Sequence, residues 1–175
     1  KNSGDPYLVK DSIADIIYQT CEFDKAKLDL KLAITPKNKI AGLYFVPPVS
    51  RKGYQLPAYI NKDRVIETPM EIKSGKYVLP AMFTYPKTGT KFPVVILVHG
   101  SGPNDKDETI GPNKIFKDLA FGLADKGIAV LRYEKRTRQY QTECFENINE
   151  LTIKEEVIDD ALAAIQTAKS VVAID

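Results

Sequence analysis

The segment His99-Gly100-Ser101-Gly102-Pro103 has the residue types and spacing that could support chemistry in this chain. It directly follows residues 94–98, an unbroken aliphatic run that predicts a central parallel strand buried on both faces. Glycines at a strand end let backbone N–H groups point toward a ligand, because glycine has no Cβ to restrict the turn. Such donors can hold the oxyanion of an acyl-transfer intermediate, and losing one typically costs on the order of 10²–10³ in rate. The segment is therefore a candidate oxyanion-binding loop.

The residues around this loop predict an α/β domain, which we place at residues 62–175. Strand–helix–strand–helix order implies right-handed crossovers between parallel strands. The second helix begins with Thr152-x-x-Glu155, which matches a capping box. In chain order we expect strands at 65–72, 77–85 and 94–98, a helix at 113–126, a strand at 128–131, a helix at 152–168, and a loop or new strand at 170–174. The apolar faces of the helices are expected at Ile115, Phe116, Leu119, Ala120 and Leu123, and at Ile153, Val157, Ala161, Leu162 and Ile165.

Residues 1–48 predict a small antiparallel β domain that looks incomplete. Apolar and mostly polar residues alternate strictly along residues 27–35, as in a half-buried strand, and residues 40–46 form its hairpin partner after a turn at Pro36. Residues 13–21 predict a third strand, although their isoleucines also fit helical spacing. The proline-rich stretch at 47–61 is the expected linker.

Composition excludes several classes of function. With 175 residues, and roughly 150 residues per domain, the chain holds one domain or two small ones. The net charge of +2 is too balanced for a nucleic-acid or polybasic membrane surface, and no apolar run approaches the ~18 residues of a membrane span. The single histidine excludes a multi-histidine metal site. Cys21 and Cys144 lack metal-binding spacing, and a disulfide bond between them stays open. We expect no metal and no cofactor.

The loop and its flanking elements resemble the α/β-hydrolase family. The segment HGSGPNDKDET, together with the upstream stretch CEFDKAKLDLKL, is most similar to bacterial dienelactone-hydrolase-like or prolyl-oligopeptidase-like esterases. Those proteins carry a small N-terminal accessory domain. In that fold the third strand ends in His-Gly, and the next residue supplies an oxyanion-hole N–H. The resemblance implies backbone donation by Ser101 and its neighbour Gly102, with His99 and Gly100 shaping the loop. Residues 134–137 resemble the Asp-x-Arg-Gly segment after strand four, but with Glu134 and Thr137 in place of Asp and Gly.

The family's catalytic triad has no counterpart in this chain. None of the serines lies in Gly-x-Ser-x-Gly, and no histidine follows His99. We therefore expect an N-terminal fragment of a serine hydrolase that acts on a small-molecule acyl substrate, with no catalytic residue here and no activity by itself. The alternative is a non-catalytic binding or scaffold module. The resembling proteins are often exported from bacteria, and the missing initiator methionine fits a removed leader as well as an artificially shortened chain.

Other candidate residues have a structural explanation that we prefer. Ser101 or Cys144 paired with His99 as nucleophile and base is possible, but a turn residue and an ordinary thiol are favoured. Asn104, Asp105, Asp107 and Glu108 suggest a solvated acidic loop rather than a cation site, and Lys135, Arg136 and Arg138 a solvated basic loop or a pocket wall in the intact enzyme.

Self-association is the partner interaction that the resemblance implies. Strand five lies beside strand three in the resembling fold. Without strand five, residues 94–98 would present an unpaired edge. We expect self-association through this edge or through the N-terminal sheet.

Overall fold

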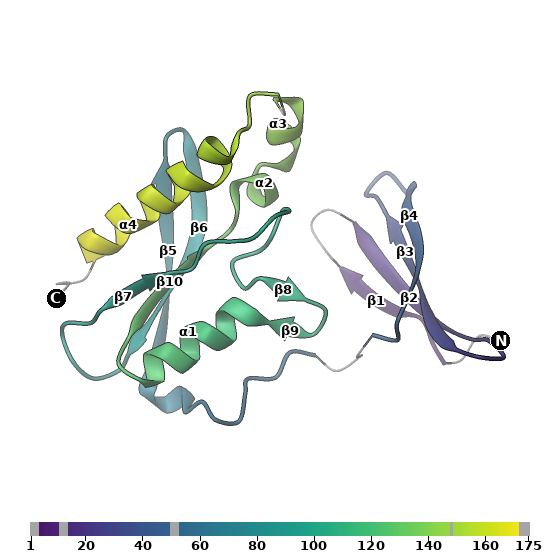
Figure 1. Ribbon diagram of the computed structural model, residues 1–175, viewed down its shortest axis with the longest axis horizontal. Coiled ribbons are helices and arrows are strands. Elements are labelled where there is room, and N and C mark those ends of the chain that lie inside the picture. The colour runs from purple at the N-terminus through teal and green to yellow at the C-terminus, as the bar shows by residue number, and fades with distance from the viewer. Residues whose placement is uncertain (1–3, 11–13, 50–52, 148, 172–175) are drawn as a thin grey trace. The chain divides into compact units, whose positions relative to one another are not determined.

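The computed structural model describes residues 4–10, 14–49, 53–147 and 149–171. The chain divides into two compact units, Lys1–Gly53 and Tyr54–Asp175 (Figure 1). Each unit is described below by itself.

The first unit is a four-stranded antiparallel sheet in the order β1-β2-β3-β4. The two strands expected at 27–35 and 40–46 are confirmed. The third expected strand is confirmed from Asp15 onward, and Ile13 of that segment lies outside the described residues. The helical alternative for that segment is wrong, and β1 is an additional strand that the sequence pattern did not predict. The strands are β1 (Tyr7–Lys10), β2 (Asp15–Glu22), β3 (Lys27–Ile34) and β4 (Ile40–Val46).

The second unit is built on a mixed four-stranded sheet in the order β5-β6-β10-β7. β5 and β6 form an antiparallel hairpin, β10 pairs antiparallel with β6, and β7 pairs parallel with β10. These strands agree with the expected positions to within a few residues. They are β5 (Val65–Ser74), β6 (Tyr77–Pro86), β7 (Val94–Ile96) and β10 (Ala129–Tyr133).

The expectation that residues 94–98 form a central strand buried on both faces is wrong. β10 is the strand whose residues are all buried, whereas β7 ends at Ile96, is half-buried, and has one neighbour within the described sheet. Val98 is 41% exposed. The aliphatic run therefore marks an edge strand, because no further described strand pairs with its outer side.

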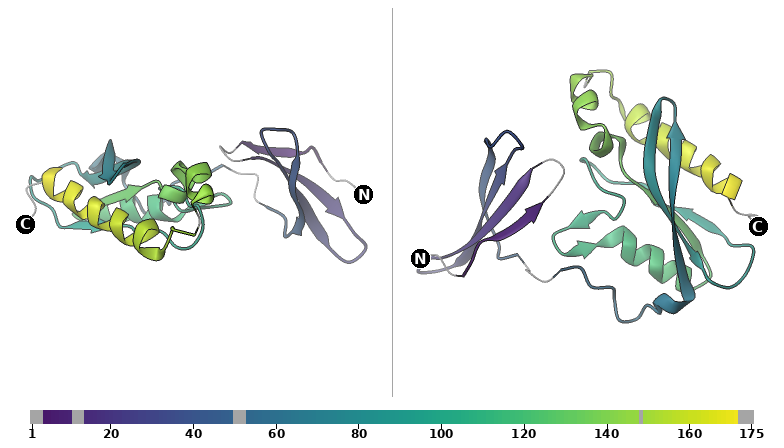
Figure 2. Two further views of the ribbon diagram at one scale, coloured as in Figure 1. Left: turned by 90° about the horizontal axis from the view of Figure 1, so that it is seen from above. Right: turned by 180° about the vertical axis from the view of Figure 1, so that it is seen from behind.

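Helices lie on both faces of this sheet (Figure 2). The residues that alternate along β10 show which helix covers which face. Leu131 and Tyr133 share the hydrophobic core with Ala164 and Ala168 of α4 (Asp159–Val171). Arg132 points to the opposite face, since successive side chains alternate along a strand. There it pairs with Glu67, whose other oxygen lies 3.8 Å from Lys117 of α1 (Ile115–Asp125), which places α1 on that face.

The two expected helices are confirmed, with shifted starts. Residues 113–114 belong to β9 (Asn113–Lys114), which pairs with β8 (Thr109–Ile110), so α1 begins afterwards. The second helix starts with a π-helical turn, η2 (Lys154–Ile158), and continues as α4. A loop or new strand was expected from Ser170, but α4 continues through this residue. Residues 172–174 of the expected segment lie outside the described residues. Short helices η1 (Lys62–Arg64), α2 (Arg136–Gln139) and α3 (Gln141–Glu146) complete the unit.

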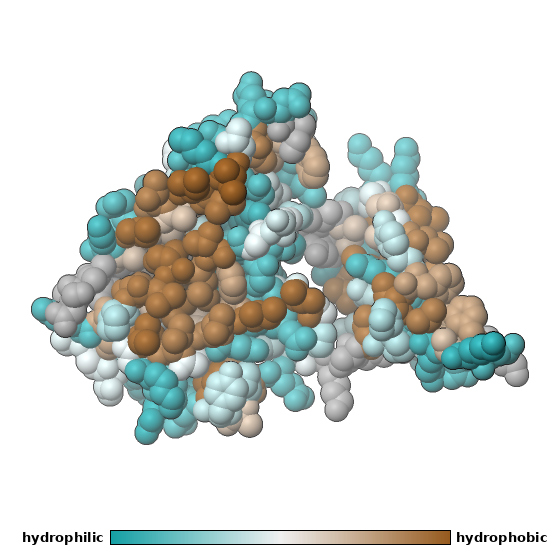
Figure 3. Space-filling model, viewed as in Figure 1, coloured by the Kyte–Doolittle hydropathy of each residue, from teal (hydrophilic) through white to brown (hydrophobic). Residues whose placement is uncertain are grey.

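The residues expected to pack against the sheet from the two long helices are only partly correct. The buried positions are Ala120, Phe121 and Ala124 on α1, and Asp160, Ala164 and Ala168 on α4. Small residues let each helix lie close to the sheet, which turns neighbouring large side chains outward. Apolar side chains consequently gather over α4, β7 and α1 on the viewed surface (Figure 3). We define the apolar face as Val98, Ile115, Leu119, Ile158, Leu162 and Ile165, which are 37–55% exposed.

Candidate oxyanion loop

His99 anchors the start of the loop that leaves β7. Its side chain is buried, lies edge-on to Tyr133 at 5.1 Å between ring centroids, and lies 5.5 Å from the ring of Phe116. Nε2 is 3.1 Å from the Asp105 carbonyl oxygen. Because a carbonyl only accepts hydrogen bonds, Nε2 carries the proton and donates. The ring thus ties the two ends of the loop together, and Ser101 lies on an exposed part of it.

Burial lowers the pKa of His99 from its ordinary value to about 4, against the hydrogen bond to Asp105, which acts in the other direction. The imidazole is therefore neutral at pH 7. A neutral, buried ring that is already bonded through Nε2 serves to hold the loop.

This pKa predicts a pH dependence of stability. The unfolded chain binds a proton near pH 6.5 and the folded chain only near pH 4, so the free energy of unfolding falls as the pH drops through this window. The expected slope is about 1.4 kcal/mol per pH unit. Urea unfolding between pH 4 and 7 measures it, with His99→Gln as the control that lacks this contribution. Equal slopes for the two proteins would contradict the prediction.

Ser101 and Gly102 present backbone donors that nothing in the described structure uses. Both residues are exposed, and neither N–H donates to an acceptor within the described residues. Their carbonyl oxygens are occupied: Asn104 donates from Nδ2 to Ser101 at 3.1 Å and from its backbone N–H to Gly102 at 3.0 Å. Gly102 has φ 95°, which a residue with a side chain rarely adopts. The loop therefore uses the carbonyls of Ser101 and Gly102 in internal hydrogen bonds and leaves two consecutive N–H groups available for an anion.

Gly100 is fixed at both of its polar groups. The Glu108 carboxylate accepts a hydrogen bond from the Gly100 N–H, and Lys135 Nζ donates to the Gly100 carbonyl at 2.8 Å. Glu108 has φ 48°, its Oε2 is buried and has no hydrogen-bond partner among the described residues, and burial raises the pKa of this carboxyl. Because its N–H is already used, Gly100 shapes the loop and is not itself a free donor.

The expectation of a solvated acidic loop is wrong for Asp107. This side chain is buried, and its oxygens accept from Arg132 Nε at 3.0 Å and from Lys114 Nζ at 2.6 Å. Burial raises the pKa of Asp107, but these two cations outweigh burial and hold it below the ordinary value. Asp105 organises the turn, since its Oδ1 accepts from the backbone N–H groups of Asp107 and Thr109. No group of three His, Cys, Asp or Glu side chains suited to a metal ion occurs among the residues described.

The expectation of a solvated basic loop is wrong for Lys135 and Arg136, which are 3% and 6% exposed. Lys135 Nζ lies 2.8 Å from Glu156 Oε1 as well as from the Gly100 carbonyl. Arg136 pairs with Asp160, which is fully buried. The charge of these two residues suggested that they are exposed to solvent. They are buried because acidic partners from a later segment of the chain neutralise them.

A cavity of about 190 Å³ borders the loop and is largely apolar. It is lined by Gly102, Pro103, Thr137, Cys144, Phe145, Leu151 and Glu156. The Cys144 thiol is free, donates weakly to the Arg136 carbonyl at 3.8 Å, and has its pKa raised by burial. The structure therefore forms no disulfide with Cys21, and it joins Cys144 to His99 by no hydrogen bond in its described part. A protonated, buried thiol is a poor nucleophile.

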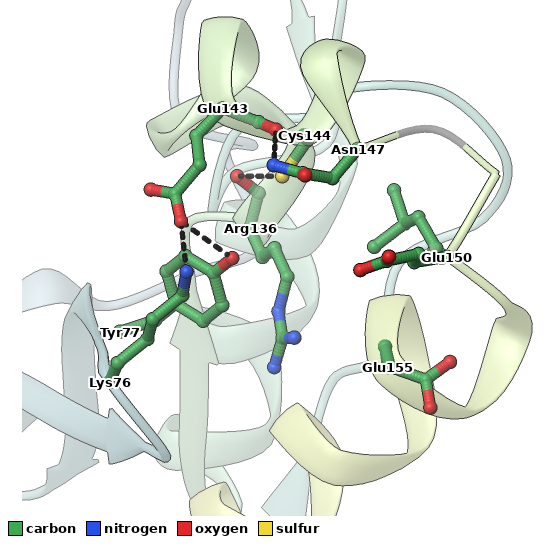
Figure 4. A pocket seen from close by; sticks show the side chains of 9 residues that line it. Lys76, Tyr77, Arg136, Glu143, Cys144, Asn147, Glu150 and Glu155 are labelled. Atoms are coloured by element: carbon green, nitrogen blue, oxygen red, sulfur yellow. Dashed lines mark hydrogen bonds and ion pairs between the residues drawn. The ribbon is translucent and has the colours of Figure 1, made fainter.

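A second cavity, of about 270 Å³, has a different character (Figure 4). Its lining includes Arg136, Lys76, Tyr77 and Glu143, and the Glu143 carboxylate pairs with Lys76 and accepts from the Tyr77 hydroxyl. These polar groups are partnered with one another, and the glycine loop does not line the cavity. Of these two cavities, the one beside Gly102 is therefore the one that the glycine loop borders.

Comparison with known proteins finds a similar esterase. No protein-family model matches the chain. The chain is 43% identical over 150 residues to Esterase EstD of Thermotoga maritima, a match that covers 86% of this chain. The match covers 34% of that esterase, so the chain spans about a third of the length of the curated relative.

No helix among the described residues is long and apolar enough to cross a membrane.

Proposed function

We propose that this chain supplies the oxyanion-binding part of a serine carboxylic-ester hydrolase with the α/β-hydrolase fold. The observation that carries the proposal is the pair of unused N–H groups at Ser101 and Gly102, in the loop that follows β7. The strand order β5-β6-β10-β7 and the similarity to an esterase support it.

The chemistry assigned to this chain is stabilisation of negative charge. When a nucleophile attacks an ester carbonyl, the carbonyl oxygen becomes an oxyanion, and the two backbone donors bind it more strongly than the neutral carbonyl. The cavity beside Gly102 would hold an apolar part of the substrate against Pro103 and Leu151. The nucleophile, acid and base would come from sequence beyond this chain, because its serines lack the Gly-x-Ser-x-Gly setting.

The test compares this chain with the full-length protein encoded by its gene, using p-nitrophenyl acetate. We expect turnover by the full-length protein and none above the buffer background by residues 1–175 alone. Turnover by residues 1–175 that is lost in Ser101→Ala or Cys144→Ala would contradict the assignment of catalysis to sequence beyond this chain. A folded full-length protein without turnover on p-nitrophenyl esters would favour the binding or scaffold alternative, in which residues 1–48 recruit a partner.

We also propose that residues 1–175 self-associate in isolation through the edge of β7 and the adjoining apolar face. The edge presents unpaired backbone groups, and the apolar face adds hydrophobic area around it. Light scattering at tens of micromolar is expected to show a species larger than a monomer. Leu162→Glu should shift it toward the monomer, whereas Leu43→Glu, on β4 of the first unit, should not. A strictly monomeric starting protein would refute the proposal, and a shift by Leu43→Glu alone would assign association to the N-terminal sheet.

A further inference from the structure

Lys135 is a buried lysine whose ammonium reaches the glycine loop from another part of the chain. It lies between β10 and α2, is 3% exposed, and donates from Nζ to the Gly100 carbonyl at 2.8 Å. Its second acceptor is Glu156 Oε1, also at 2.8 Å. Burying an ammonium is costly unless it is paired and hydrogen-bonded. Both conditions are met here, and one of the two acceptors belongs to the loop itself.

The hydrogen bond to Gly100 acts directly on the Ser101 N–H, because the Gly100 carbonyl and the Ser101 N–H belong to one peptide group. That group is planar and, since the described chain has no cis peptide bonds, its carbonyl and N–H point in opposite directions. Holding the carbonyl oxygen against Lys135 Nζ therefore fixes the Ser101 N–H on the opposite side. A single side chain thus sets the direction of the donor that would meet an oxyanion.

The charge of Lys135 also acts on the strength of that donor. A hydrogen bond from a cation to a carbonyl polarises the peptide group, which increases the positive character of its N–H. Asn104 Nδ2 approaches the same carbonyl at 3.4 Å, but it is neutral and more distant. Glu108 holds the other peptide group of Gly100, through the Gly100 N–H. The described structure therefore gives this carbonyl one charged donor, Lys135.

Glu156 keeps the ammonium in place. It lies in the π-helical turn η2, and its Oε1 also accepts from the Thr137 hydroxyl at 3.2 Å. The backbone N–H of Lys135 donates to the Asn104 carbonyl at 3.3 Å, which joins the two segments a second time. Single π-helical turns often occur at functional sites, and here the turn carries the counter-ion of Lys135.

We propose that Lys135 is a positioning residue for the oxyanion hole: it orients and polarises the Gly100–Ser101 peptide group, and Glu156 holds its ammonium against the Gly100 carbonyl. This inference rests on the proposed esterase function. It adds a side chain to a site whose donors are otherwise backbone groups.

The kinetic test uses the full-length protein and p-nitrophenyl acetate. Lys135→Met keeps the aliphatic stem and removes the donor, and we expect kcat to fall by about tenfold to a hundredfold, less than the loss of a whole donor, with KM unchanged. The double variant Lys135→Met/Glu156→Gln leaves no unpaired carboxylate and should show the same fall in kcat. The control is Lys106→Met, which removes a partly exposed lysine paired with Glu134 and should leave kcat unchanged.

A second measurement follows the amide directly in residues 1–175. In ¹⁵N-labelled protein, Lys135→Met and the double variant should move the Ser101 amide proton upfield, and Lys106→Met should not. If the wild-type full-length protein has no turnover, the proposed function fails, while the Ser101 signal still tests the contact with Lys135. If the wild type is active and both Lys135 variants keep its kcat and its Ser101 signal, the inference is wrong. The double variant decides the result if the single variant does not fold.

Discussion

Replacing Arg136 by methionine is expected to lower the free energy of unfolding of the second unit by about 3–5 kcal/mol. Asp160 is 1% exposed, and Arg136 donates to both of its carboxylate oxygens, from Nε at 3.1 Å and from Nη2 at 2.5 Å. Removing the guanidinium leaves this carboxylate buried without its cation. Arg136 also donates to Ser74 Oγ, so the variant loses a link between α4 and the β5–β6 hairpin. Urea unfolding at pH 7 measures the loss.

Two further variants separate the buried pair from a general effect of charge. Arg138→Met removes a neighbouring arginine whose Nε lies 3.6 Å from Glu134, and it is expected to cost less than about 1 kcal/mol. Arg136→Met/Asp160→Leu replaces the whole pair by apolar groups and should regain much of the stability lost in Arg136→Met. Equal losses in Arg136→Met and Arg138→Met would show that the burial of Asp160 does not determine the cost.

Local patterns in the sequence were sufficient for most of the secondary structure. The alternation along β3 indicates a strand with one solvent-facing side and one apolar side, and the aliphatic residues of β10 fit the interior of a sheet. Gly127, with φ 93°, lies just after α1 and stops the helix, because glycine readily adopts this backbone conformation. Such features depend on neighbouring residues alone.

The buried ionic network could not be predicted, because its members lie far apart in the sequence. Arg132 reaches Glu67, Thr84 and Asp107 from the centre of the sheet. A charged residue in an otherwise apolar strand is the signal that could have revealed it. The partners depend on strand order and on the path of the loop, which residue type does not determine.

The same limit applies to the candidate site. The types and spacing of His99, Gly100 and Gly102 indicated an anion-binding turn, since glycine and a strand end suffice for that prediction. Lys135 reaches the loop from a different segment, and its charge alone suggested a solvated position. Which N–H groups are free is a property of the folded hydrogen-bond network.

Replacing Ser101 by proline in the full-length protein is expected to lower kcat for p-nitrophenyl acetate by about 10²–10³-fold. Proline removes the N–H that we assign to the oxyanion, and that N–H donates to no acceptor within the described residues, so folding loses no hydrogen bond. The φ of Ser101 is not positive, and the preceding Gly100 tolerates the restriction that proline imposes. Thermal unfolding of the variant verifies that the fold is kept.

Ser101→Ala is the matched control, because alanine keeps the backbone N–H and removes only the hydroxyl. If the backbone donor is the functional group, this variant should keep kcat within about threefold of the wild type, a change of less than ~0.7 kcal/mol in transition-state stabilisation. A loss in Ser101→Ala as large as in Ser101→Pro would assign the effect to the hydroxyl. Full activity in a folded Ser101→Pro variant would remove Ser101 from the oxyanion hole and leave Gly102 as the remaining donor of this loop.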